Sequence, residues 1–142
     1  MLAGKIALII AAAFTGAALY VNIAEQPARL TLDDRALLAE WKPSYQFGAP
    51  MQASFAMISG AFGLLAGLLT EDWTWVFGAV LILANWPYTL LGILPLNHRL
   101  NAIAPDQANA TSRALIERWG RLHAYRTALG FTATLAYLWA LD

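Results

Sequence analysis

The most restrictive feature of the sequence is a series of long apolar segments separated by short polar ones. Ile6 to Ala24 and Pro50 to Thr70 are almost entirely apolar, and so is most of Trp73 to Leu96. A helix rises about 1.5 Å per residue, so roughly 20 apolar residues cross the hydrocarbon layer of a bilayer. Each segment has about that length, and the sequence therefore predicts membrane-spanning helices.

A fourth apolar segment, Leu122 to Leu141, follows polar turns that Thr111 or Ser112 would cap. We expect spans at about 4–25, 50–70, 73–96 and 112–141, forming one transmembrane domain over residues 1–142. The expected fold class is all-α, an integral-membrane four-helix bundle with short amphipathic helices in its two long loops. The first of these helices would begin at Thr31 or Asp33 and end at Lys42-Pro43.

The composition agrees with a membrane environment. Of the 142 residues, 59% are hydrophobic and 13% charged, whereas a soluble domain has about 45–50% apolar and about 25% charged residues. The formal net charge is zero, which gives no indication of nucleic-acid binding. The absence of cysteine excludes disulfides, thiolate nucleophiles and cysteine-ligated metals. The expected partners are the lipid bilayer and a hydrophobic small molecule.

Basic residues predict the orientation. The first segment begins like a secretory signal peptide, with Lys5 before an apolar run, but it continues to Val21, so we expect a retained helix. Lys5 is also the only basic residue expected at the end that holds the termini. Eight others fall on the opposite side: Arg29, Arg35, Lys42, Arg99, Arg113, Arg118, Arg121 and Arg126. The positive-inside rule then places the long loops in the cytoplasm and both termini outside, in a bacterial-type inner membrane.

Antiparallel spans bring one carboxylate, one imidazole and one guanidinium to a shared depth. Glu25 ends the first span, while His123 and Arg126 begin the fourth, on the helical face that also carries Trp119. Ionisable groups in a membrane segment are costly and usually face a bundle interior. We therefore take Glu25, His123 and Arg126 as candidate catalytic residues. The candidate substrate-binding residues are Asn22, Tyr45, Asn85, Trp86, Tyr88, Asn97 and Trp119.

Structural alternatives remain open for each of these residues. Arg126 would reach lipid phosphates at the interface, and Glu25 would pair with Arg126 or Arg29. His123 would be a hydrogen-bonded packing residue. Small residues recur every four positions from Gly120 to Ala140, and this stripe predicts packing against another helix or a second copy of the chain.

Metal and haem sites have weak support. His98, His123 and Glu25 would make a set of two histidines and one carboxylate suited to ferrous iron. The two histidines would also suffice in number as axial haem ligands. No HxxxH or ExxH spacing is present, and no nucleotide-binding loop or serine nucleophile elbow occurs. We therefore assign no metal or cofactor, with iron or haem kept as alternatives.

Four stretches resemble a family of small four-helix membrane proteins grouped with the anthrone oxygenases. They are YVNIAEQPARL (Tyr20–Leu30), LLAEWKPSY (Leu37–Tyr45), ANWPYTLLGILPLN (Ala84–Asn97) and RALIERWGRLHAYRTALG (Arg113–Gly130). The family pattern has an asparagine at the position of Asn97 and a W-x-x-x-H-x-x-R core. In this chain the core is Trp119, His123 and Arg126.

Fungal relatives in that family oxidise anthrones to anthraquinones with dioxygen. The resemblance therefore implies a membrane-embedded oxidoreductase or oxygenase that acts on a hydrophobic phenolic, anthrone- or quinol-like molecule. The alternative is a non-catalytic module that binds lipid, quinone or haem, or that serves as an assembly partner. Apart from this choice, a homo-oligomer is among the expected partners.

Overall fold

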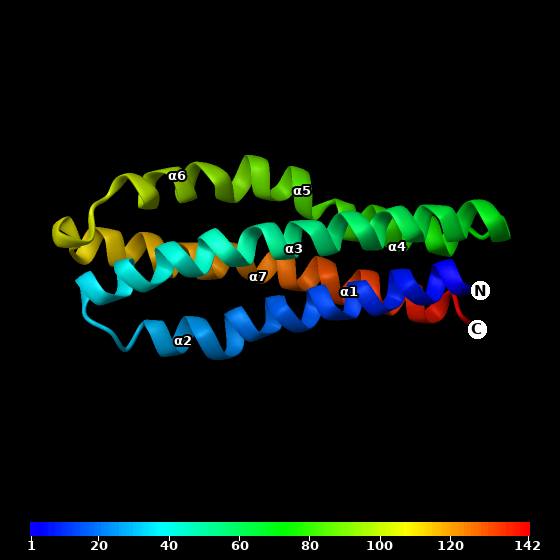
Figure 1. The fold of residues 1–142 in the computed structure, drawn as a ribbon, viewed down its shortest axis with the longest axis horizontal. Coiled ribbons are helices and arrows are strands. Elements are labelled where there is room, and N and C mark those ends of the chain that lie inside the picture. The colour runs from blue at the N-terminus through cyan, green and yellow to red at the C-terminus, as the bar shows by residue number, and fades with distance from the viewer.

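The computed structural model describes residues 1–142 as four helical rods in one bundle, with both chain ends at the same end (Figure 1). The first rod comprises α1 (Leu2–Tyr20), the π-helical η1 (Val21–Glu25) and α2 (Gln26–Arg29). The second is α3 (Asp34–Thr70). The third comprises α4 (Trp73–Leu83), α5 (Asn85–Tyr88), the π-helical η2 (Thr89–Ile93) and α6 (Leu94–Ala102). A 3₁₀ turn, η3 (Pro105–Gln107), leads to α7 (Ala110–Trp139). The predicted all-α four-helix bundle is confirmed.

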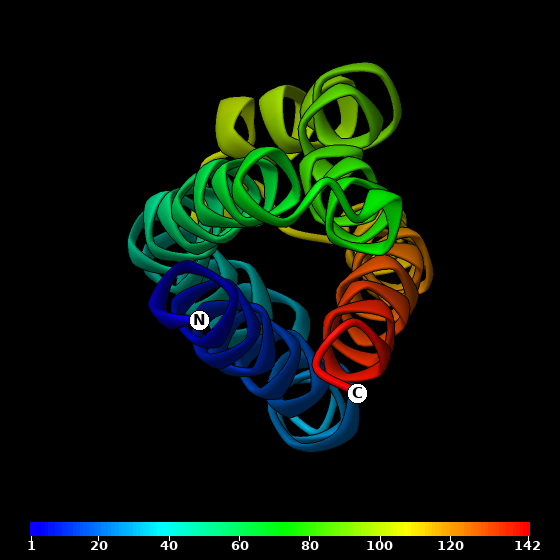
Figure 2. The same cartoon turned by 90° about the vertical axis from the view of Figure 1, so that its right-hand side faces the viewer.

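Three of the rods are long and apolar enough to cross a membrane: Leu2–Arg29, Asp34–Thr70 and Trp73–Ala102. Large apolar side chains such as Leu68 and Leu91 point outward from them, as expected where lipid replaces water. The fourth rod, α7, runs alongside in the end-on view of Figure 2. Its first turns carry several arginines, which lower its overall hydropathy.

The end of the bundle near the termini is tightly packed because small residues line the contacts. Tyr137 is fully buried and lies against Gly63 of α3 and Gly78 of α4. Its hydroxyl donates a hydrogen bond to the carbonyl of Ser59 at 3.2 Å. The α7 glycine Gly130 faces Phe14 in the same way. These contacts have the close approach that glycine permits between membrane helices.

The small-residue stripe of α7 is only partly a packing surface. Gly120 and Ala136 are buried, but Ala124, Ala128 and Thr132 between them are exposed. A spacing of four advances about 40° beyond one full turn at each step, so such a stripe winds around the helix. The buried face of α7 instead follows the helical period of three and four residues.

Helices extend further than the sequence predicted. α3 is unbroken from Asp34 to Thr70 and contains Pro43 and Pro50, so the prediction that Lys42-Pro43 ends a separate loop helix is wrong. Tertiary contacts hold this region helical despite the missing N–H groups. Lys42 Nζ donates to the carbonyls of Asn101 and Ile103, at 3.0 and 2.5 Å.

The other helix ends show the same trend. The first rod reaches Arg29, because Pro27 occupies the first turn of α2, where its missing N–H is tolerated. The third rod reaches Ala102 instead of ending near residue 96. Asn109, not Thr111 or Ser112, caps α7 and forms a capping box with Ser112.

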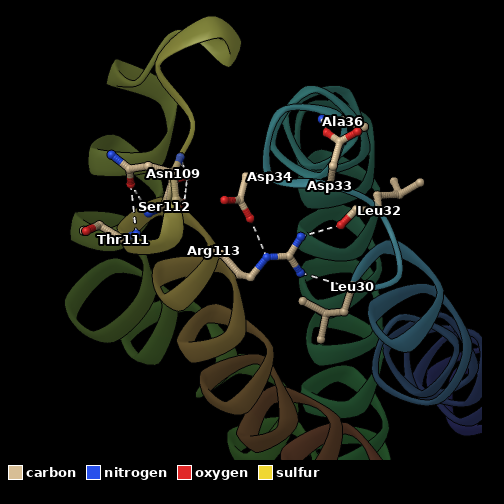
Figure 3. Close-up of polar contacts among 9 residues, drawn as sticks. All are labelled: Leu30, Leu32, Asp33, Asp34, Ala36, Asn109, Thr111, Ser112 and Arg113. Carbon is tan, nitrogen blue, oxygen red and sulfur yellow. Dashed lines mark hydrogen bonds and ion pairs between the residues drawn. The ribbon is translucent and has the colours of Figure 1, made fainter.

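The loop between α2 and α3 is fixed to the start of α7 (Figure 3). Asp33 is the N-cap of α3, and its side chain accepts a hydrogen bond from the Ala36 amide at 2.8 Å. Arg113 pairs through Nε with Asp34 at 2.5 Å and donates to the carbonyls of Leu30 and Leu32. One guanidinium thereby fixes three points of the loop and sets the spacing of the rods at this end.

Candidate functional site

All four rods line a cavity of about 1050 Å³ in the half of the bundle away from the termini. Small-molecule pockets occupy roughly 300–1,000 Å³, so this volume suits a drug-sized ligand. Four aromatic residues contribute to the wall: Tyr20, Tyr45, Trp86 and Trp119. The polar or charged residues that line it include Glu25, Gln52, Asn85, Thr89, Asn97, His123 and Arg126.

Two π-turns border the cavity. η1 interrupts the first rod and η2 the third, each with five residues. A π-turn inserts an extra residue and often occurs at functional sites. In the third rod it follows a break at Ala84 and the short helix α5, which contains Pro87. Figure 1 shows α5 and α6 displaced from the line of α4.

His123 lies on the cavity wall in a defined hydrogen-bonding state. The residue is 4% exposed, and its Nδ1 lies 2.9 Å from Asn22 Oδ1. An amide oxygen only accepts, so Nδ1 donates, and Nε2 of the neutral ring carries the free lone pair. Nε2 has no hydrogen-bond partner and is not among the enclosed polar atoms. Nε2 of this cavity-lining ring is therefore an acceptor without a protein partner.

Asn22, on the first rod, fixes the orientation of His123. Its Oδ1 also accepts from the Thr127 hydroxyl at 2.7 Å, and its Nδ2 donates to the Gly120 carbonyl at 2.9 Å. One turn away, Gln26 Nε2 donates to the Ile116 carbonyl at 2.9 Å. Two amides of the first rod therefore hold it against α7.

Trp119 packs against His123 on the same wall, with ring centroids 5.0 Å apart and an interplanar angle of 32°. Trp41 meets the Trp119 ring edge-on at 5.9 Å and stacks on Tyr45 at 5.0 Å. Two of these aromatic residues, Tyr45 and Trp119, line the cavity, whereas Trp41 is fully buried behind them.

Glu25 lines the cavity, but its carboxylate is already engaged. Oε1 lies 2.8 Å from Arg29 Nη2 and accepts from the Ser44 hydroxyl at 2.6 Å. Arg29 is 2% exposed and also pairs with Glu40 at 3.0 Å. Of the alternatives open from the sequence, the structure shows Glu25 paired with Arg29. This pairing leaves His123 as the better-placed base.

Arg126 faces the cavity from the middle of α7 and is 8% exposed. Nη1 donates to the Thr89 hydroxyl at 2.5 Å, and Nη2 donates to Gln52 Oε1 at 3.2 Å. The guanidinium carbon lies 5.6 Å from the centre of the Phe14 ring. Arg126 therefore points into the bundle and not toward lipid phosphates.

The remaining predicted residues divide into two groups. Tyr45, Asn85, Trp86, Asn97 and Trp119 line the cavity. Asn22 does not line the cavity itself and contributes through its hydrogen bond with His123. Tyr88 does not line the cavity either, and its hydroxyl donates to the Leu122 carbonyl at 2.7 Å. Asn85 Nδ2 donates to the Ile82 carbonyl at 3.0 Å, and the side-chain oxygens of both Asn85 and Asn97 are enclosed without a partner.

The suggested metal and haem arrangements do not form. His98 is exposed on α6 and does not line the cavity, so it does not join His123 and Glu25. No group of three histidine or acidic side chains is placed to hold a metal ion. Axial haem ligation by both histidines would likewise need His98 to face inward.

Two residues of the site were not among the candidate residues: Thr89 and Arg29. Gln52, at the start of the second span, was expected at the same end of the bundle as Glu25 and His123. Thr89 is an isolated polar residue inside an apolar segment, and this pattern is the signal that would have identified it. Arg29 was read as a topology marker, although it is 2% exposed and its guanidinium lies 5.6 Å from the centre of the Trp119 ring.

Where His123 acts as the base of a reaction in the cavity, Asn22→Ala is expected to lower its turnover by up to about 100-fold, because a misplaced reacting group costs about that much. The change removes the acceptor that fixes the tautomer and orientation of His123. Gln26→Ala is the matched control, since it removes an equivalent bond between the rods without touching His123. The control should lower the melting temperature and leave turnover unchanged. Equal turnover in the two variants would contradict a positioning role for Asn22.

Comparison with curated proteins and with solved structures gives no match. A family model described as anthrone oxygenase matches residues 41–136. The matched range runs from Trp41 through most of α7, and it includes every cavity residue except those of the first rod. The chain therefore belongs to the anthrone oxygenase family.

Proposed function

We propose that the protein is a membrane-embedded oxygenase that oxidises a flat, hydrophobic phenolic, anthrone- or quinol-like molecule with dioxygen. The observation that carries this proposal is the free Nε2 of His123 on the wall of an aromatic cavity. Family membership supports the reaction class. The apolar residues Met51, Trp86 and Leu90 line the cavity and are exposed, so a lipophilic substrate has access from the bilayer.

The proposed reaction begins with a proton transfer. An anthrone methylene is acidic because its carbanion is an aromatic anthrolate. His123 Nε2 removes this proton, and the amide nitrogens of Gln52 and Asn97 supply hydrogen-bond donors for the oxyanion. Neither nitrogen has a protein partner, and neither is enclosed. Arg126 adds a positive charge to the same wall.

The anion then reduces dioxygen. A carbon–oxygen bond forms, and the resulting peroxide takes back the proton from His123. Loss of water, with the second methylene hydrogen, leaves a carbonyl. One dioxygen is consumed for each quinone and each water formed, so atoms and electrons balance.

The test is dioxygen uptake by the purified protein in detergent, with a series of anthrones and quinols as substrates. The expected result is quinone formation equal to dioxygen consumed, faster than in the His123→Ala variant. No rate above that variant for any substrate in the series would contradict the proposal. Ligand binding without dioxygen uptake would instead favour a quinone- or lipid-binding module.

We also propose that α7 crosses the membrane as a fourth span, with the loop end in the cytoplasm of a bacterial-type inner membrane. The excess of basic residues at that end supports this orientation. The chain has no cysteine, so single cysteines replacing Asp106 and Lys5 report on the two ends. Labelling only the Asp106 position in intact cells by an impermeant thiol reagent would contradict the orientation.

A further inference from the structure

Arg126 is a buried cation for which the protein supplies no counter-ion. Its exposed fraction is 8%, and no carboxylate lies within ion-pair distance. The chain treats its other buried arginine differently, because Arg29 pairs with both Glu25 and Glu40. Removing a charge from water is costly unless it is paired and hydrogen-bonded. The isolated charge of Arg126 is therefore a feature that needs a partner from outside the chain.

The neighbours of Arg126 are neutral. Two of its five N–H donors are satisfied by Thr89 and Gln52, and its Nε is enclosed without an acceptor. One N–H on each terminal nitrogen remains for a ligand in the cavity. The geometry of two N–H groups from one guanidinium matches the two oxygens of a carboxylate or a single anionic oxygen.

Glu25 is the only carboxylate on the cavity wall, and it lies at a different level. Arg126 sits over Phe14, and Glu25 lies 11 residues further along the first rod, about 16 Å at the rise of a helix. Its charge is also neutralised by Arg29. Glu25 therefore does not neutralise the charge of Arg126.

We propose that the cavity takes its ligand as an anion, an apolar molecule with an ionised oxygen that rests against Arg126. This inference rests on the proposed function for the identity of the cavity and adds a substrate class, aromatic acids or acidic phenols bound in their ionised form. Arg126 and His123 are three residues apart on one helical face. The acidic group and the carbon that loses its proton therefore lie on the same ring or on adjacent rings.

The test compares binding of anthraquinone-2-carboxylate with binding of the neutral carboxamide, which has the same shape and is inert to dioxygen. Quenching of tryptophan fluorescence in an uncharged detergent reports binding, because Trp86 and Trp119 line the cavity. The wild type should bind the carboxylate roughly 10- to 100-fold more tightly, the range of a charge-assisted hydrogen bond. Equal affinity for the two compounds would overturn the proposal without any variant.

Variants assign the preference to one side chain. Arg126→Gln should abolish the preference for the carboxylate, and Arg126→Lys should retain part of it. Arg121→Gln is the matched control, because Arg121 is exposed on the same helix and does not line the cavity. A preference that survives Arg126→Gln, or that disappears in Arg121→Gln, would overturn the assignment. Melting temperatures identify a variant that fails to fold. In that case the binding of carboxylate and carboxamide by the wild type tests the proposal.

A fatty acid carries the same carboxylate as an aromatic acid, so a further binding experiment uses decanoate as the ligand. Displacement of the anthraquinone carboxylate by decanoate, lost in Arg126→Gln, would support the anion site and identify fatty acids as a source. Binding does not require turnover. A carboxylate preference in a protein that oxidises no anthrone would therefore leave this inference standing while the proposed function fails.

Discussion

His123→Ala is expected to lower kcat for anthrone oxidation by about 100- to 10,000-fold, the usual contribution of general acid–base catalysis. The variant loses the only cavity nitrogen with a free lone pair and a fixed tautomer. Its fold should survive, because Asn22 Oδ1 keeps the hydrogen bond from Thr127. Dioxygen uptake and the melting temperature in detergent are the two measurements.

Two controls separate catalysis from packing at this position. Thr127→Val removes the other hydrogen bond to the same oxygen of Asn22 and should leave turnover nearly unchanged. Added imidazole should restore part of the rate of His123→Ala, because it can occupy the vacated space and accept the proton. If turnover falls only in proportion to the loss of stability, His123 has a structural role. Unchanged turnover would also contradict its assignment as the base.

Gly63→Ala is expected to destabilise the bundle by about 1–3 kcal/mol, the usual cost of overpacking a core. A Cβ atom at this position would lie 2.1 Å from the Tyr137 hydroxyl oxygen and 2.7 Å from Cζ. Tyr137 has little room to move away, because Gly78 also lies against its ring and its hydroxyl is bonded to Ser59. Thermal unfolding in detergent measures the change.

Gly16→Ala is the matched control for this prediction, because no atom lies within 4 Å of the added Cβ. It should keep or raise the melting temperature, since alanine is favoured over glycine in helices by about 1 kcal/mol. Combining Gly63→Ala with Tyr137→Phe should restore only part of the stability, because the contact at Cζ remains. Similar melting temperatures for Gly63→Ala and Gly16→Ala would show that this end of the bundle is loosely packed.

Much of the candidate site was predictable because membrane segments restrict where polar groups can lie. His123, Arg126, Glu25 and Asn97 were identified as polar residues in or beside apolar spans, and all four line the cavity, with Glu25 at a different level from Arg126. Their partners were not predictable. The sequence allowed Glu25 to pair with either arginine. In the structure it pairs with Arg29, one turn further along the same rod, and the packing of this rod against α3 adds the Ser44 hydroxyl.

The helix boundaries show the limit of local signals. Pro43 and Pro50 predict helix ends, yet α3 continues through both, because contacts of Lys42 and the buried Trp41 hold that region against other rods. The π-turns left no clear mark in the sequence. Each π-turn changes which residues of a rod face the cavity, and this depends on how the rods pack together in the assembled bundle.

The sequence by itself determined the helical fold, the apolar character of the rods and the set of polar residues available for chemistry. These follow from the cost of exposing backbone and polar groups to hydrocarbon, which acts on each segment separately. Only the tertiary structure decided that Nε2 of His123 has no protein partner, that Tyr88 and His98 lie outside the cavity, and that Arg126 has no counter-ion. Those outcomes depend on distances between rods, and these distances arise from how four helices with different side chains pack together.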